Sequence, residues 1–440
     1  MLLCVIYVFA PYVTNVVLGG GPAAQATFSG WQTWGGVIVA LTAPFLGAAA
    51  DRMGHRKPLL AVAVAIMAPA VFLQWWALPN HAGLPVGAIA FLIVAAGVSY
   101  AWTEVLHNAM LTTATKPSQV SAVSGLGLSL GNAGSVLLLV FVLFAFALPG
   151  QLPIPGLPSA PLFGLNAASH EPSRIVTPLA AVWLVIFSLP MFLFTPDRNP
   201  SGESYFAAFR DGVGGVARTI GRLFRDYRNV ALFLVARMLY VDATTAIVIF
   251  GGIYPSGVFH WGLIELLAFG VTLSAFAVLG GFVSAWLDST FGPKRAVAIE
   301  LLVTLVCLIG MVSMSPAQIL FFIPVDPAAH VWSGPVFSTA PELAYLAFSV
   351  IIAVSITGAY ASSRGLMARL APPGMEGEIF GLYALSSSAT AWLAPGLVTI
   401  FTAALVSSRA GFASIGLLLL AGLALLMLVK PPAGANKSTA

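Results

Sequence analysis

The stretch Gly47-Ala-Ala-Ala-Asp51-Arg52-Met-Gly54-His55-Arg56-Lys57 separates two long apolar segments and brings together an acid, a glycine and a basic pair. Gly54 permits a tight turn between two helices. Asp51 can pair with a neighbouring guanidinium group or cap a helix N-terminus. Such a cluster could hold two helix ends together in one conformation and release them in another, although a basic membrane anchor with an incidental aspartate explains a single copy equally well.

A second copy of this motif favours the first interpretation. It runs Ser284-Ala-Trp-Leu-Asp288-Ser-Thr-Phe-Gly292-Pro-Lys294-Arg295, with the acid, the glycine and the basic pair in the same order. The order of apolar segments and loops around the two copies is also duplicated. We therefore expect two homologous halves, with a solute path at their interface near the middle of the bilayer. The predicted gating residues are Gly47, Asp51, Arg52, Gly54, Arg56, Lys57, Asp288, Gly292, Lys294 and Arg295.

The composition indicates that lipid surrounds most of the chain. Of its 440 residues, 59% are hydrophobic and 8% are charged, and the mean hydropathy is +0.95. A soluble domain has about 25% charged residues, so a water-soluble enzyme is excluded. The formal net charge of +4 is spread over short loops. Because the charges do not gather on one face, we expect no nucleic-acid partner.

Twelve stretches are apolar and long enough to span a bilayer, which takes about 20 residues each. They are 1–19, 28–50, 58–78, 85–106, 120–147, 175–195, 230–254, 264–287, 296–315, 341–361, 378–404 and 409–429. The predicted fold class is an all-α integral membrane protein with twelve transmembrane helices in two pseudo-symmetric six-helix bundles. The N-terminal bundle covers 1–195, a cytoplasmic linker covers 196–229, and the C-terminal bundle covers 230–440.

The linker 196–229 has a helical pattern of its own. Apolar residues such as Phe206, Val213 and Ile220 recur at helical spacing, and arginines fall between them. This pattern is typical of an amphipathic helix in the headgroup layer. Three glycines weaken it, so a plain basic linker is an equal alternative.

The basic residues predict the orientation of the chain. In the twelve-span topology, 16 of the 19 Lys and Arg residues fall on one side, Arg174 and Arg409 fall on the other, and Arg237 lies inside a span. By the positive-inside rule both termini are cytoplasmic, which corresponds to the inner (plasma) membrane in a bacterial cell. We expect the protein to act as a monomer in contact with membrane lipid.

These motifs resemble those of the major facilitator superfamily and, more narrowly, of the "unknown major facilitator" family, which is related to the autophagy-linked vacuole effluxers. The segments that carry the resemblance are 43–58, 234–242, 250–254, 363–374 and 380–383. The resemblance covers nearly the whole chain and implies the major facilitator fold and export of amino acids or similar small metabolites. The acidic–Trp–Ala motif that the family has before its first span is absent from this sequence.

Ionisable residues inside a span are costly in lipid and usually face a bundle interior or a wet cavity. Arg237 and Asp242 lie about 10 Å and 18 Å from the cytoplasmic end of their span, with Tyr240 between them, and they point about 140° apart. Each therefore needs a partner on another helix or on a solute. We predict that Arg237 pairs with Glu104 in one of two access states. Asp242 is the candidate for solute-amine binding or proton coupling, with a static ion pair that fixes packing nearly as favoured.

Other polar and aromatic residues within the spans could line a solute cavity. The candidates are Tyr100, Thr103, Asn132, Thr244, Thr245, Tyr360, Tyr383 and Trp392. No cofactor or metal is predicted, because the six histidines are scattered over separate loops and the two cysteines, Cys4 and Cys307, lie in apolar runs.

The sequence favours a secondary transporter over an enzyme. We expect it to move a small polar solute by alternating access, to export amino acids or related metabolites, and to use protons as a candidate coupling ion. The alternatives are a carrier of sugars or organic acids and a polytopic membrane enzyme that acts on a lipid-linked substrate. The enzyme would need acids, histidines or metal ligands clustered at one membrane face, which the sequence does not show. A passive channel is disfavoured because no filter-like loop is visible.

Overall fold

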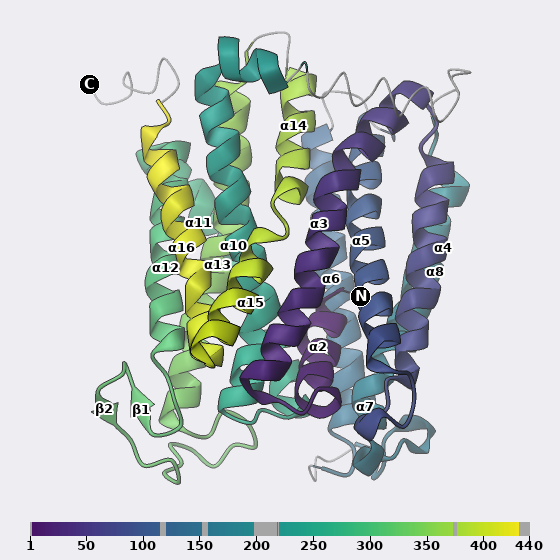
Figure 1. Ribbon diagram of the computed structural model, residues 1–440, viewed down its shortest axis with the longest axis vertical. Helices are drawn as coiled ribbons and strands as arrows, with labels where there is room; N and C mark the ends of the chain where they lie inside the picture. Colours follow the sequence, from purple (N-terminus) through teal and green to yellow (C-terminus); the bar gives the residue numbers. More distant parts are fainter. Residues whose placement is uncertain are drawn as a thin grey trace.

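The computed structural model describes residues 2–114, 120–151, 157–197, 218, 220–372 and 376–430. Within this part of the chain, ten helical segments are long and apolar enough to cross a membrane. Two further helical segments, at the start of the chain, complete a set of twelve. The predicted fold class, an all-α membrane protein with two six-helix halves, is confirmed. Figure 1 shows the halves side by side, with α3 and α15 between them.

The N-terminal half begins with a run of alternating α and π turns. This run consists of α1 (Leu2–Cys4), η1 (Val5–Phe9), α2 (Ala10–Tyr12) and η2 (Val13–Val17). It is followed by α3 (Gly21–Met53), α4 (Lys57–Leu73), α5 (Val86–Ala114), α6 (Val120–Val142) with its continuation η6 (Leu143–Ala147), α7 (Glu171–Arg174) and α8 (Val176–Phe194).

The C-terminal half is also built of helices. They are α10 (Arg228–Val258), α11 (Leu263–Phe291), α12 (Pro293–Val312), α13 (Ala340–Leu370), α14 (Glu376–Ala389), α15 (Leu393–Leu405) and α16 (Ser408–Leu428). A short hairpin of β1 (Gln318–Ile319) and β2 (Ile323–Pro324), which the sequence analysis did not predict, lies in the loop before α13.

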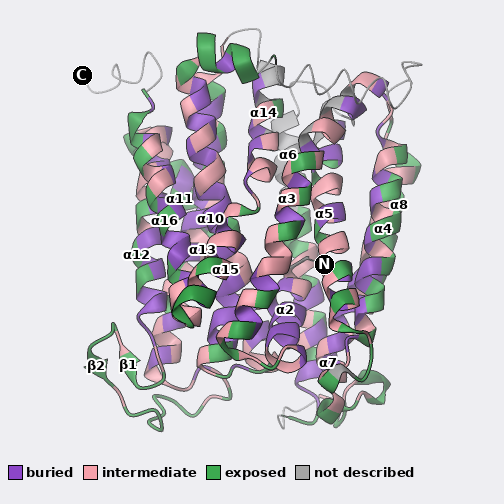
Figure 2. Ribbon diagram, in the orientation of Figure 1, coloured by how far each residue is buried: buried purple, intermediate pink, exposed green. Residues whose placement is uncertain are grey.

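Exposed apolar side chains mark the faces that meet lipid. Phe91, Phe187 and Phe282 are between 61% and 72% exposed, which is costly in water but favourable in a bilayer. By contrast α10 is largely buried among other helices, as its colouring in Figure 2 shows. Arg237 and Asp242 therefore lie on one of the two most buried of these ten spans, the other being α12 (Pro293–Val312).

A matching pair of lysine contacts shows the internal repeat. The ammonium group of Lys57, at the start of α4, donates to the carbonyl oxygen of Phe192 near the end of α8, at 2.8 Å. In the other half Lys294, at the start of α12, donates to the carbonyl oxygen of Met427 near the end of α16, at 2.9 Å. Both lysines follow the aspartate of their motif by the same spacing. The repeated sequence motif therefore makes the same helix-to-helix contact twice.

The contact surface between the two halves, which we call the seam, is closed at the end that is lower in Figure 1. The side-chain amide of Asn15 donates to Ser256 at 2.7 Å, and Thr399 donates to Ser29 at 2.9 Å. Gln25 donates to both the Thr402 hydroxyl and the Ser408 carbonyl oxygen. These bonds join the first helical run, which ends with η2, to α10. They also join α3 to α15 and α16.

Glycines allow the closest approaches across the seam. A Cβ atom at Gly270 would lie 2.8 Å from the ring of Tyr7, and one at Gly252 would lie 3.2 Å from the same ring. On α3, a Cβ atom at Gly36 would overlap the carbonyl oxygen of Ala391. Backbone therefore packs on backbone at this point, as small residues permit in membrane helices.

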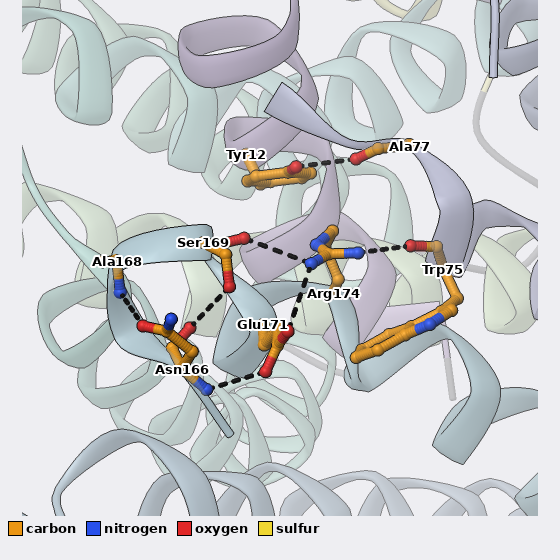
Figure 3. A network of polar contacts seen from close by, with 8 residues as sticks. All are labelled: Tyr12, Trp75, Ala77, Asn166, Ala168, Ser169, Glu171 and Arg174. Carbon is orange, nitrogen blue, oxygen red and sulfur yellow. Dashed lines mark hydrogen bonds and ion pairs between the residues drawn. The ribbon is translucent and has the colours of Figure 1, made fainter. Parts of the chain in front are cut away.

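A polar network anchors the lower loop of the N-terminal half (Figure 3). Arg174, 3% exposed, donates to the carbonyl oxygens of Trp75 and Ser169 and stacks over the Trp75 ring. Glu171 lies 3.9 Å from Arg174 and accepts a hydrogen bond from the backbone of Asn166. The sequence predicts Arg174 as a loop charge, but Arg174 is a buried anchor that joins α7 to the turn after α4.

Two other expectations differ from the structure or fall outside it. The segment 378–404, predicted as one span, is interrupted after Ala389, and α15 begins at Leu393. Most of the predicted amphipathic linker helix lies outside the described residues. Of its described part, residues 220–226 are helical, with Leu223 buried and Phe224 exposed.

Candidate transport site

Asp242 meets the interrupted helix of the C-terminal half. Its carboxylate accepts a hydrogen bond from the backbone N–H of Ala394 at 2.8 Å, and the side chain is only 4% exposed. The first amides of a helix have no partner within the helix, and they favour a negative charge. Asp242 on α10 therefore caps α15. Thr390, in the interruption, also bonds to α10 through the carbonyl oxygen of Met238.

Arg237, also on α10, contacts α14, the helix on the other side of the same interruption. Its guanidinium donates to the carbonyl oxygen of Tyr383 at 2.7 Å and to the hydroxyl of Ser386, and it stacks 3.6 Å from the centre of the Tyr383 ring. The side chain is 5% exposed, and its Nε atom has no hydrogen-bond partner. Among the described residues, no carboxylate lies within ion-pair distance of Arg237. The cation is thus buried without a counter-charge in contact.

Glu104, which the sequence analysis paired with Arg237, forms no ion pair with it among the described residues. It is exposed on α5, in the opposite half, where the charges of Arg237 and Arg364 both act on it. The predicted Arg237–Glu104 ion pair is absent from this conformation because Tyr383 and Ser386 hold the guanidinium instead. Whether it forms in a second access state stays a prediction.

Tyr240 connects α10 to α13. Its hydroxyl lies 2.6 Å from that of Ser363, and the side chain is 1% exposed. Tyr240 is therefore a packed residue between Arg237 and Asp242 and does not face open space.

Only some of the predicted cavity residues are placed to meet a solute. Thr245 is exposed, with its hydroxyl 3.4 Å from that of Tyr360. Thr244 is 2% exposed and bonds to its own helix through Val241, so it does not face open space in this conformation. Thr103 also bonds within its own helix and is half-buried.

The remaining predicted lining residues divide by environment. Tyr100 is half-buried and packs in the N-terminal bundle with α4 and α8. Asn132 is exposed on α6, and Trp392 lies at the interruption before α15. Tyr383 is 6% exposed and serves as the platform for Arg237.

The first gating motif is tied to the end of α8. Asp197 accepts hydrogen bonds from the backbone N–H groups of Arg56 and Lys57, at 2.9 to 3.1 Å, and so caps α4. Gly54 has φ +85°, a conformation that favours glycine. The side chain of Asp51 lies outside the described part of the chain, so the carboxylate that we observe on this turn is a different one. A Cβ atom added at Gly47 would lie 3.3 Å from the side chain of Val105 on α5, and Arg52 is not without a partner.

In the described part of the chain, no side chain caps the start of α12 in the second gating motif. Gly292 has φ +79° and ends α11, while Lys294 makes the contact to α16 described above. The Asp288 carboxylate has one oxygen with no hydrogen-bond partner. Arg295 is exposed.

A cavity of about 320 Å³ lies in the seam near its closed end. It is lined by Asn15 and Gln25 from the N-terminal half and by Tyr254 and Arg409 from the C-terminal half. The sequence had placed Arg409 in an outer loop. Arg409 therefore places a positive charge in the seam.

Sequence reasoning missed three residues of functional interest. Arg364 was assigned to a loop but lies within α13, and Ser386 was not singled out although it bonds to Arg237. Glu300 lies inside α12 and is 2% exposed. The rule that an ionisable residue within a span is a functional candidate would have found Glu300.

Known proteins resemble this chain in sequence over most of its length. The family model described as "Vacuole effluxer Atg22 like" matches residues 107–438. An uncharacterized MFS-type transporter, YxiO of Bacillus subtilis (strain 168), is 22% identical over 89% of this chain and 82% of its own length. Autophagy-related protein 22-1 of Aspergillus niger (strain ATCC MYA-4892 / CBS 513.88 / FGSC A1513) is 26% identical over 58% of this chain, a match that spans 41% of that protein.

Solved structures show the same fold. A D-xylose-proton symporter matches with a TM-score of 0.66 at 10% identity, over 98% of this chain and 95% of that one. A bacterial homologue of the iron transporter ferroportin in its inward-facing state matches with a TM-score of 0.60 at 14% identity, over 97% of each chain. Because the family model covers most of the sequence and the fold is that of major facilitator transporters, this chain belongs to the vacuole effluxer Atg22-like family of that superfamily.

Proposed function

We propose that this protein is a secondary transporter that exports a small carboxylate-bearing solute, of the amino-acid class, by alternating access between its two halves. Membership of a family of MFS-type transporters supports the general activity. The family description names an effluxer, which supports export as the direction. The carboxylate is inferred from the chemistry of the site.

The observation that carries the proposal is the buried cation without a counter-charge. A guanidinium removed from water is strongly destabilising unless an anion or several acceptors compensate it. Arg237 has two oxygen acceptors and an aromatic face, and its Nε donor is unused. A carboxylate can accept two parallel hydrogen bonds from a guanidinium. A solute carboxylate would complete this site.

Glu104 supplies the complementary group on the opposite half. Glu104 is an exposed residue of α5, and the charge of Arg237 acts on its carboxyl group. An α-amino acid has an ammonium group beside its carboxylate, so it could bridge Arg237 and Glu104 and draw the halves together. Organic acids would use only Arg237, and sugars would use neither charge.

The rival proposal of a lipid-linked enzyme has no supporting cluster. Within the described residues, no group of three or more His, Cys, Asp or Glu side chains could hold a metal ion. The full sequence also lacks a Walker phosphate-binding loop, so ATP is not the proposed energy source. An ion gradient is the remaining source, and the proton is our candidate.

Counterflow in proteoliposomes tests this proposal. Vesicles loaded with one unlabelled L-amino acid at a time are diluted into the same labelled compound, with organic acids and sugars in parallel. We expect uptake of at least one amino acid and a loss of at least tenfold in Arg237→Gln. Arg225→Gln, which removes an exposed arginine of the linker, is the matched control and should transport normally. Uptake that is unaffected by Arg237→Gln would contradict the assigned site.

The proposed orientation follows from the loops. The ends of α3, α8, α11 and α16 lie together at the upper end of Figure 1. Arg52, Lys294 and Lys430 lie at or next to these ends, and the twelve-span topology assigns 16 of the 19 basic residues to this side, so we propose that this end faces the cytoplasm. The partners we propose are the solute, protons and membrane lipid, with the protein acting as a monomer.

A further inference from the structure

A second buried acid lies away from the seam, inside the C-terminal half. Glu300 of α12 is 2% exposed, and its Oε2 atom has no hydrogen-bond partner. The nearest donor to its other oxygen is the hydroxyl of Ser362 on α13, at 3.5 Å, which is a weak contact. An ionised carboxylate in this position would be nearly unsolvated.

The charged groups around Glu300 do not neutralise it. From α11 comes Asp288, another acid, which has one unpartnered oxygen and repels a negative charge on Glu300. On α13 the charge of Arg369 acts on Asp288. Lys294 of α12 is bonded to α16, and the one charged side chain of α16, Arg409, is at the opposite end of that helix. Among the described residues, Glu300 has no ion pair.

The packing leaves little room for any cation larger than a proton. Gly358 of α13 lies so close to Glu300 that an added Cβ atom would overlap the carboxyl group, and Gly280 of α11 is equally close to the α13 backbone. Towards the lipid, Glu300 borders a groove of about 360 Å³ whose other walls are nearly all apolar, among them Val303 and Ile351. Neither side offers the several oxygen ligands that a metal ion requires.

We propose that Glu300 is a proton-binding site, protonated in the conformation described here, and that loss of the proton separates α12 from α13. In the protonated form the carboxyl group is neutral and fits the dry packing against Gly358. On release, the O–H bond breaks and the proton passes to the Asp288 carboxylate and then to water at the nearby end of α11, which ends at Phe291. The charge left on Glu300 then favours solvent over the helix interface.

Two adjacent serines connect this acid to the transport site. Ser362 contacts Glu300 and also lies 2.8 Å from Ser284 of α11. Ser363, the next residue of α13, lies 2.6 Å from the hydroxyl of Tyr240, one helical turn from Arg237. A shift of α13 away from α12 would therefore disturb both contacts. This coupling rests on the proposed function, whereas proton binding by Glu300 does not.

Infrared difference spectroscopy of the purified protein tests proton binding without any solute. Between acidic and alkaline pH, we expect the wild-type protein to lose a carbonyl-stretch band of a protonated carboxylic acid in a dry environment. Glu300→Gln should lack this band, and Ser362→Ala should shift its frequency. Glu265→Gln removes a carboxyl that caps the other end of α11 and should keep the band unchanged.

Thermal unfolding provides a second measurement. The melting temperature of the wild type should fall at alkaline pH by several degrees more than that of Glu300→Gln, because only the wild type acquires the buried charge. A wild-type protein with no such band, or a band that persists in Glu300→Gln, would overturn the proposal. Stabilisation by sodium ions in place of acid would also overturn it. If counterflow fails while the band behaves as expected, the proposed function is wrong and the proton site stands.

Discussion

Asp242 shows how one carboxylate can serve both structure and transport. It caps α15 through the N–H of Ala394, yet it lies one and a half turns from Arg237 on α10. The capping contact requires an oxygen acceptor, and only a transport role requires a charge or a titrating group. The two roles can therefore be separated by the choice of substitution.

We predict that Asp242→Asn folds normally and loses transport or its pH dependence. The amide oxygen of asparagine can still accept from Ala394, so the melting temperature should stay close to that of the wild type. Asp242→Ala also removes the cap and should destabilise the protein by about 1–2 kcal/mol. Counterflow and thermal unfolding are measured for both variants. Normal transport by Asp242→Asn would leave Asp242 a purely structural residue.

The contacts of Arg237 and Asp242 show what the sequence could and could not predict. Both residues could be identified from the sequence, because an ionisable residue within a predicted span is costly to bury in lipid and so stands out. The break in the eleventh span has a local signal that the sequence analysis did not use, because Pro395 cannot donate a hydrogen bond to the carbonyl oxygen of Ala391 and would clash with it in a continuous helix. The groups that meet Arg237 and Asp242 around this break depend on contacts between helices, so local sequence does not reveal them.

At the scale of elements, α3 packs against the C-terminal half through Gly36. We predict that Gly36→Ala destabilises the closed lower end, because the new methyl group would overlap the carbonyl oxygen of Ala391. Overpacking of this kind costs about 1–3 kcal/mol. Gly97→Ala on α5 is the matched control, since no atom lies within 4 Å of the added Cβ atom.

The measurement for Gly36→Ala is alkylation of a cysteine introduced at Asn15, in the lower cavity. Labelling from outside should become several-fold faster in Gly36→Ala and stay unchanged in Gly97→Ala. Equal rates in all three backgrounds would show that Gly36 does not hold the lower end closed.

The cap on α4 gives a second prediction for an element. Asp197→Ala removes the acceptor for the amides of Arg56 and Lys57 and should lower the free energy of unfolding by about 1–2 kcal/mol. Asp197→Asn retains one acceptor oxygen and should cost less. Thermal unfolding in detergent distinguishes them, and an unchanged melting temperature in Asp197→Ala would argue against capping. The sequence assigned the acidic role at this turn to Asp51, because a partner some 140 residues away leaves no local signal.

At the scale of the whole molecule, the lysine contacts of the two halves confirm that the duplicated motif reflects a duplicated structure. The approximate positions of most spans follow from hydropathy, but α3 and α13 extend several residues beyond their predicted limits, the first run is mixed and the eleventh span is interrupted. The polar face of α3 carries Gln25, Ser29 and Thr33, which lower its hydropathy but suit a helix at the seam. Hydropathy reflects contact with lipid, so it is least able to detect helices that pack against the opposite half.

The orientation of the molecule is directly testable. Green fluorescent protein fused after Ala440 should fluoresce, and alkaline phosphatase fused at the same place should be inactive, because the positive-inside rule places that end in the cytoplasm. Phosphatase fused after His330, in the loop that carries the hairpin, should be active. The reverse pattern would invert the proposed topology and, with it, the direction of export.

The interruption between α14 and α15 divides the eleventh span into two parts with separate attachments. The lower part, α15, is hydrogen-bonded to α3 through Thr399 and Ser29. The upper part, α14, carries the acceptors of Arg237. Bending at Ala391 would let the upper part swing while the lower part stays anchored. A change in access at the cytoplasmic end would then require movement of α14 alone instead of a tilt of the entire six-helix half. The hinge for that movement lies within a single span.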